Sequence, residues 1–132
     1  MDSLRLGPIG QIAWPVCDVA RSARWYGEVL GLPHLYTYGD LAFFDCGGTR
    51  LMLSVPEDGN TEGGNTAAGH PSVLYFRVED IHAAHGDLRS RGVEFVDDPH
   101  MIFRHLSGVE EWMAFFTDPD GHLLAIMAQV PA

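Results

Sequence analysis

The chain has 132 residues with 8 arginines, no lysine and 18 acidic residues, which give a formal net charge of −10. With 46% hydrophobic and 20% charged residues, it has the composition of a globular protein, and we expect one domain over residues 1–132. The acidic balance argues against a nucleic-acid partner and against an anionic membrane surface, because both require basic groups. The absence of lysine also excludes Schiff-base chemistry.

Neither the cysteines nor the first residues of the sequence indicate a secreted protein or a structural zinc site. Cys17 and Cys46 are too few for a disulfide framework or a four-ligand zinc site. Each adjoins an aspartate, whose negative charge raises rather than lowers a thiol pKa. The first residues lack the apolar core of a signal peptide, and no run of apolar residues is long enough to span a bilayer. We therefore expect a cytoplasmic protein that does not enter the membrane.

The first half of the chain predicts one strand, one helix and then three strands. The apolar segment at residues 9–16 is typical of a strand, and Asp18 is placed to cap the helix that follows. This helix is expected to run to about Leu30 and to stop at Gly31. Turns rich in glycine then separate three short predicted strands, at residues 34–38, 41–46 and 50–55.

The second half predicts the same order of elements after a connector. Residues 57–71, which include His70, are rich in Gly, Asn, Thr and acids, as is typical of a linker. A strand is expected next, and then a helix that Asp80 caps and Gly92 ends. The predicted elements of this half are a strand at 72–78, the helix at 81–91, the start of a strand at 93–96, an irregular stretch at 97–110, and a hairpin of residues 112–117 and 122–129.

The two halves also resemble each other in sequence. A shift of 62 positions superposes residues 16–19 on residues 78–81, and a shift of 73 superposes residues 48–51 on residues 121–124. Each half would form a sheet with a helix on only one face. Two such halves are expected to pack together.

Three stretches of the chain, residues 9–32, 73–92 and 115–126, resemble the vicinal oxygen chelate superfamily. This superfamily groups glyoxalase I, bleomycin-resistance proteins and extradiol dioxygenases. The resemblance implies an α+β fold in which two βαβββ modules, at about 8–56 and 72–130, form a cupped eight-stranded mixed sheet. It also implies a homodimer.

The superfamily places its metal ligands at four inward-facing strand positions. By resemblance these positions are Gln11, Met52, Val73 and Ala125 in this sequence, and the internal repeat relates them in pairs. A thioether and two aliphatic side chains offer no donor to a hard divalent ion, and Gln11 alone offers an amide oxygen. The sequence therefore predicts no cofactor and no metal at the usual site.

The predicted cup has a mostly apolar lining with a few polar points, which is typical of a pocket for an organic ligand. The same lining would also suit a packed core or a dimer seam. Strand alternation directs Arg50 and Tyr75 inward, and the rings of Phe103 and Trp112 could stack on a planar or cationic ligand. The candidate ligand-binding residues are Gln11, Arg50, Met52, Val73, Tyr75, Phe103, Trp112 and Ala125.

The irregular stretch is a candidate source of catalytic groups. If it folded over the mouth of the cup, it would supply two histidines, two carboxylates and an aromatic surface; otherwise it would be a solvated hairpin. The candidate catalytic residues are Tyr75, His100, His105 and Glu111. A displaced metal site would combine His100 and His105 with Glu110 or Glu111.

Three functions are compatible with these patterns. The favoured hypothesis is metal-free binding of a small organic molecule, aromatic or cationic, as in drug or metabolite sequestration. The alternative is a lyase, isomerase or dioxygenase that uses the displaced metal site or acid–base chemistry. A third possibility is a non-catalytic interaction module whose cup is filled by Met52, Tyr75 and Met127.

Overall fold

The computed structural model describes residues 5–56 and 72–132. The predicted linker at 57–71, with His70, lies outside the described residues. The chain divides into two compact units, Met1–Thr61 and Glu62–Ala132, and each is considered by itself.

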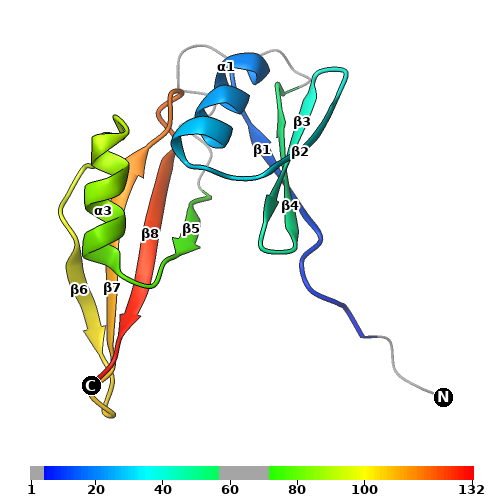
Figure 1. Ribbon diagram of the computed structural model, residues 1–132. Helices are drawn as coiled ribbons and strands as arrows, with labels where there is room; N and C mark the ends of the chain where they lie inside the picture. Colours follow the sequence, from blue (N-terminus) through cyan, green and yellow to red (C-terminus); the bar gives the residue numbers. More distant parts are fainter. Residues whose placement is uncertain (1–4, 57–71) are drawn as a thin grey trace. The chain divides into compact units, whose positions relative to one another are not determined.

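Unit 1 contains the predicted order of strand, helix and three strands. Its elements are β1 (Gln11–Pro15), α1 (Val19–Arg24), the π-helical turn η1 (Trp25–Val29), β2 (His34–Tyr38), β3 (Leu41–Cys46) and β4 (Thr49–Ser54). The strands form one sheet in the order β1-β4-β3-β2 (Figure 1). β1 runs parallel to β4, whereas β3 is antiparallel to both of its neighbours.

The helix of unit 1 begins as predicted but ends in a different geometry. The Asp18 carboxylate accepts a hydrogen bond from the Arg21 backbone N–H at 3.0 Å, which confirms the N-cap. After Arg24 the α-helix widens into η1, where the Leu30 N–H bonds to the carbonyl of Trp25, five residues earlier. The continuous α-helix expected to run to Leu30 is therefore wrong in its last turn. Apolar spacing alone does not distinguish the two kinds of turn.

The core of unit 1 lies on the face of the sheet that α1 covers. Trp14, Phe44, Leu51 and Leu53 are almost completely buried there. Because side chains alternate along a strand, the intervening residues of β1 and β4 point to the opposite face. This opposite face carries the polar groups described below.

Unit 2 repeats the architecture. Its elements are β5 (Leu74–Arg77), α3 (Ile81–Ser90), β6 (His100–Arg104), β7 (Glu110–Thr117) and β8 (Leu123–Val130). The sheet order is β5-β8-β7-β6, with β5 parallel to β8 (Figure 1). The fold is therefore α+β, and the strands of residues 5–56 and 72–132 form two four-stranded mixed sheets.

The prediction of an irregular stretch at residues 97–110 is wrong. The stretch is not irregular, because residues 100–104 form the edge strand β6, antiparallel to β7. A register shift between Met101 and Phe103 interrupts the alternation, so that the segment lacks the period-two pattern by which a strand is recognised. The strand expected at 93–96 is reduced to a single bridge between Phe95 and Phe116.

The core of unit 2 lies between its sheet and α3. Ile81, Phe116, Leu124 and Ile126 are almost completely buried. α3 begins at the predicted cap, because Asp80 accepts hydrogen bonds from the backbone N–H groups of the next turn. Within the described residues, no helix has the length and apolar character needed to cross a membrane.

Candidate functional site

A cationic cluster occupies the face of the unit 1 sheet opposite α1. The Arg50 Nε donates a hydrogen bond to Gln11 Oε1 at 2.7 Å, and Nη1 donates to the Tyr36 hydroxyl at 3.2 Å. The guanidinium carbon lies 5.2 Å from the centroid of the Phe43 ring, within the range of a cation–π contact. We refer to Gln11, Tyr36, Phe43, Arg50 and Met52 as the Arg50 cluster.

Strand register assembles this cluster. Gln11 lies opposite Arg50 in the parallel pair of β1 and β4. Phe43 lies opposite Met52 on one side and opposite Tyr36 on the other. The rings of Tyr36 and Phe43 stack with centroids 4.4 Å apart and an interplanar angle of 23°. The guanidinium therefore rests against a stacked aromatic pair.

The residues at the metal-ligand positions do not suit a divalent cation. The amide oxygen of Gln11 already accepts from Arg50, and its nitrogen points at the Met52 sulfur at 3.8 Å. A cation at that oxygen would also meet the positive charge of the guanidinium. In unit 2, Val73 offers only an aliphatic side chain and Ala125 is fully buried. These side chains therefore do not provide a ligand set for a divalent metal.

A second polar cluster occupies the face of the unit 2 sheet opposite α3. The Glu111 carboxylate lies 2.8 Å from His105 Nε2 and accepts a hydrogen bond from Gln129 Nε2, also at 2.8 Å. The Phe103 ring meets the His105 ring edge to face, with centroids 4.9 Å apart. We refer to Phe103, His105, Glu111 and Gln129 as the Glu111 cluster.

Hydrogen bonding lowers the pKa of Glu111 below its ordinary value of 4.5. The bond from His105 has the largest effect, the bond from Gln129 follows, and the charges of His105 and Arg77 add to it. The carboxylate is consequently ionised at neutral pH and can accept a hydrogen bond from the adjacent imidazole. This pairing is of the kind found where a histidine moves a proton.

Glu111→Gln is expected to reduce the loss of stability that occurs as the pH is lowered. The pKa of Glu111 is lower in the folded chain than in the unfolded chain. The stability that the ionised carboxylate contributes is therefore complete above the unfolded pKa and is lost as the pH falls through the folded pKa. Melting temperatures measured from about pH 6 down to about pH 3 should therefore fall less in the variant than in the wild type. Glu79→Gln, which removes an exposed carboxylate, is the control. Equal slopes for Glu111→Gln and wild type would contradict the assignment.

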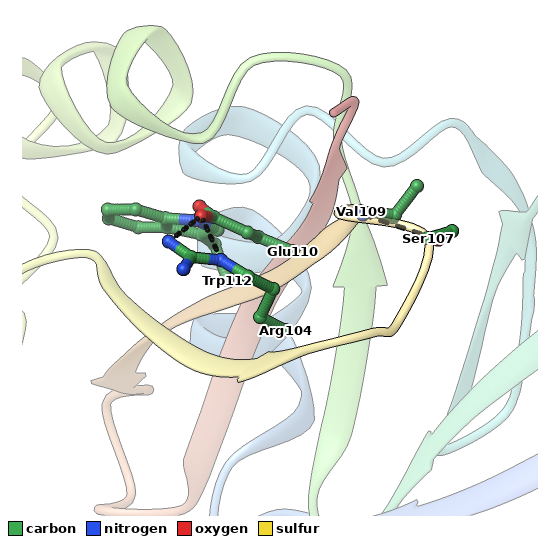
Figure 2. A network of polar contacts seen from close by, with 5 residues as sticks. All are labelled: Arg104, Ser107, Val109, Glu110 and Trp112. Carbon is green, nitrogen blue, oxygen red and sulfur yellow. Dashed lines mark hydrogen bonds and ion pairs between the residues drawn. The ribbon is translucent and has the colours of Figure 1, made fainter.

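Trp112 lies on the other face of the same strand. Figure 2 shows its ring nitrogen and the guanidinium of Arg104 meeting the Glu110 carboxylate; the Trp112 Nε1 distance is 2.8 Å. These two hydrogen-bonded contacts lower the pKa of Glu110. The indole ring meets His82 of α3, with centroids 5.4 Å apart. The expectation that Trp112 joins Phe103 on one ligand-binding face is therefore not met, because successive residues of β7 point to opposite faces.

The structure also separates the candidate catalytic residues. Tyr75 lies on β5 and contacts Phe115, whereas His105 follows β6 at the other edge of the sheet. Three strand spacings place these two edges about 14 Å apart. His100 approaches the backbone carbonyl of Asp98 at 2.8 Å rather than His105. Only His105 and Glu111, of the four candidates, are brought into contact.

The displaced metal site is not assembled. In the part of the chain that the structure describes, no group of three or more His, Cys, Asp or Glu side chains could hold a metal ion. β6 is an extended strand, so His100 and His105 lie toward its two ends, and Glu110 faces away from Glu111. The proposed combination of these residues is therefore wrong for the described fold.

Several members of the clusters were not identified from sequence. Tyr36, Phe43 and Gln129 belong to no recognisable sequence motif. Only the alternation of side chains along a strand could have assigned them to one face of the sheet. Their contacts depend on register between strands, and β2 has a register shift between His34 and Tyr36 that alternation does not reveal.

The free thiol of Cys46 behaves as the sequence predicts. Burial raises its pKa, and the charge of the adjacent Asp45 raises it further. Cys46 is therefore a thiol at neutral pH and is not activated as a nucleophile.

Comparisons with known proteins identify the family of this chain. The model of the Glyoxalase/Bleomycin resistance protein/Dioxygenase superfamily matches residues 8–126. The uncharacterized protein YraH of Bacillus subtilis (strain 168) is 31% identical over 129 residues, covering 88% of this chain and 94% of that protein.

Solved structures share the fold at lower identity. A virulence protein from Salmonella typhimurium superposes with a TM-score of 0.73 at 21% identity, covering 96% of this chain and 100% of that chain. A lactoylglutathione lyase from Agrobacterium tumefaciens gives a TM-score of 0.70 at 20% identity, with coverages of 93% and 94%. Because the family model spans both βαβββ units, the chain belongs to the Glyoxalase/Bleomycin resistance protein/Dioxygenase superfamily.

Proposed function

We propose that this protein binds a small organic molecule at the Arg50 cluster, through stacking and hydrogen bonds rather than through a divalent metal. The observation that carries the proposal is the contact between Arg50 Nε and Gln11 Oε1, which occupies the one amide oxygen available at the family's metal-ligand positions. The cluster combines aromatic and thioether surface with a few fixed polar groups, which is the usual make-up of a ligand site.

The exposure of the cluster supports a binding role. Arg50 and Gln11 are exposed, and Tyr36 retains 45% of its surface while one face of its ring stacks on Phe43. An aromatic ligand could therefore stack on Tyr36 without displacing the core. The aromatic ligand expected from the sequence agrees with this surface.

A fragment screen tests the proposal. Isotope-labelled protein kept in EDTA is titrated with neutral, anionic and cationic aromatic fragments, and the NMR signals of Phe43 and the Met52 methyl group are followed. We expect saturable shifts of these signals and an increase in melting temperature. Tyr36→Ala should weaken binding, whereas Thr37→Ala, on the opposite face of β2, should not. Binding that appears only after a divalent metal is added would contradict the proposal.

We further propose that the protein is a homodimer in the cytoplasm. The edge strand β6 supports a dimer, because Met101, Ile102 and Phe103 are exposed large apolar residues there. Light scattering should give twice the chain mass of 14.5 kDa. A monomer at micromolar concentration would contradict this part of the proposal.

A second candidate function is metal-free proton transfer by His105. The contact of 2.8 Å between His105 Nε2 and the Glu111 carboxylate supports it, because a carboxylate orients an imidazole and stabilises its protonated form. The reaction would then be a lyase or isomerase step in which His105 takes and returns a proton. His105 is partly exposed, so a substrate could reach the ring.

An activity assay in EDTA distinguishes the two candidates. The structural neighbour from Agrobacterium tumefaciens is named a lactoylglutathione lyase, and that named activity is one reaction to assay. Turnover that is lost in His105→Gln and kept in His100→Gln would favour catalysis. Saturable binding at the Arg50 cluster without turnover would favour the binding role.

A further inference from the structure

We infer that Arg50 recognises a carboxylate, so that the ligand is a small planar organic acid. This inference rests on the proposed binding function and names the chemical class of its ligand. It replaces the cationic ligand suggested by the overall acidity of the chain, because the charge at the site itself is positive.

Arg50 differs in its partners from Arg91 and Arg104, which both form ion pairs. Arg104 pairs with Glu110 at 2.6 Å, and Arg91 pairs with Asp87 at 3.3 Å. Arg50 forms no ion pair with any carboxylate within the described ranges. Asp45 lies opposite it in the antiparallel pair, but that side chain accepts a hydrogen bond from the Gly48 backbone N–H at 2.9 Å. The guanidinium therefore makes no direct ion pair within this part of the chain.

The guanidinium is also held in place before any ligand arrives. A guanidinium has five N–H donors. One goes to Gln11 and one to Tyr36, which leaves three without a partner among the described residues, including both on Nη2. The Phe43 ring, whose centroid lies 5.2 Å from the guanidinium carbon, also supports the group on one side. A planar donor fork that is already ordered binds a carboxylate through two parallel hydrogen bonds at reduced entropic cost.

The surroundings favour a flat apolar body attached to the carboxylate. Tyr36 and Tyr38 project from the same face of β2 and are 45% and 74% exposed. The half-buried side chain of Met52 lies on the other side of Phe43, in β4. A planar acid could thus stack on tyrosine while its carboxylate meets the Nη1 and Nη2 hydrogens of Arg50.

The test compares three compounds of similar shape that differ in charge. Benzoate is negative, benzamide is neutral and benzamidine is positive. Each is titrated into full-length labelled protein in EDTA, and the Arg50 Nε–H signal is followed together with Phe43 and Met52. We expect benzoate to shift the Arg50 signal and to bind at least about tenfold more tightly than the other two. Arg50→Gln should weaken benzoate by about tenfold, and Arg50→Lys, which keeps the charge but loses the planar fork, should weaken it by less.

Arg89→Gln is the matched control, because it removes the same charge from an exposed position of α3 and should leave benzoate binding unchanged. Equal benzoate affinity in Arg50→Gln and wild type, or tighter binding of benzamidine, would overturn the inference. In either case the proposed function would still stand, since a ligand would bind at the cluster. If no compound of any charge shifted Phe43 or Met52, both the inference and the proposed function would fall.

Discussion

Phe116→Ala is expected to lower the free energy of unfolding by about 3–5 kcal/mol. Phe116 is fully buried in the core of unit 2, and its ring packs against Phe95 with centroids 5.2 Å apart. The segment that holds Phe95 forms a β-bridge to the same residue, and the Phe115 backbone N–H donates a hydrogen bond to Asp97 at 2.8 Å. Truncation therefore leaves a cavity and removes the packing of that segment on the sheet. Urea unfolding followed by circular dichroism measures the change.

Phe103→Ala provides the comparison. Phe103 is also a phenylalanine of the unit 2 sheet, but it lies on the edge strand β6 and is 55% exposed. Its truncation should cost no more than about 1 kcal/mol, because half of the ring is already in water. Similar losses for the two variants would show that burial at Phe116 does not control the stability of unit 2.

Asp118→Ala is expected to cost about 2–4 kcal/mol. Asp118 is only 5% exposed, and its carboxylate accepts hydrogen bonds from the backbone N–H groups of Asp120 and His122 at 3.0 and 2.9 Å. These bonds close the turn between β7 and β8, and His122 is itself buried. Alanine would leave two buried donors without their acceptor.

Asp118→Asn separates this effect from the loss of charge. Asparagine keeps an amide oxygen at the same position, so that both backbone donors retain an acceptor. The Asn variant should lose less than half the free energy that the Ala variant loses, as measured by urea unfolding. Equal losses would mean that the charge of Asp118, rather than its role as an acceptor, stabilises the turn.

Much of the fold could be predicted from the sequence because local signals mark its elements. The strands of unit 1 fall within a few residues of their predicted bounds, since glycine-rich turns separate them. Asp18 and Asp80 cap their helices as expected. The internal repeat predicted two βαβββ successions, and the family comparison supports the same interpretation.

The features that could not be predicted depend on the register between neighbouring strands and on the face of the sheet to which each side chain points. The bulge in β6 removes the alternation that would mark it as a strand, so that the sequence does not show that Phe103 lies on the face of the sheet opposite to Trp112. The Arg50 cluster draws its side chains from β1, β2, β3 and β4, and one of these strands, β2, has a register shift. Sequence alternation placed Arg50 and Gln11 on one face but could not indicate their contact with each other.

A crystal structure obtained from protein exposed to both Mn²⁺ and benzoate tests the central claim most directly. Data collected at the manganese absorption edge locate the metal independently of the ligand. We predict carboxylate density against Arg50, with the guanidinium still bonded to the Gln11 amide oxygen. An anomalous peak at that amide oxygen, with Arg50 displaced from it, would contradict the account.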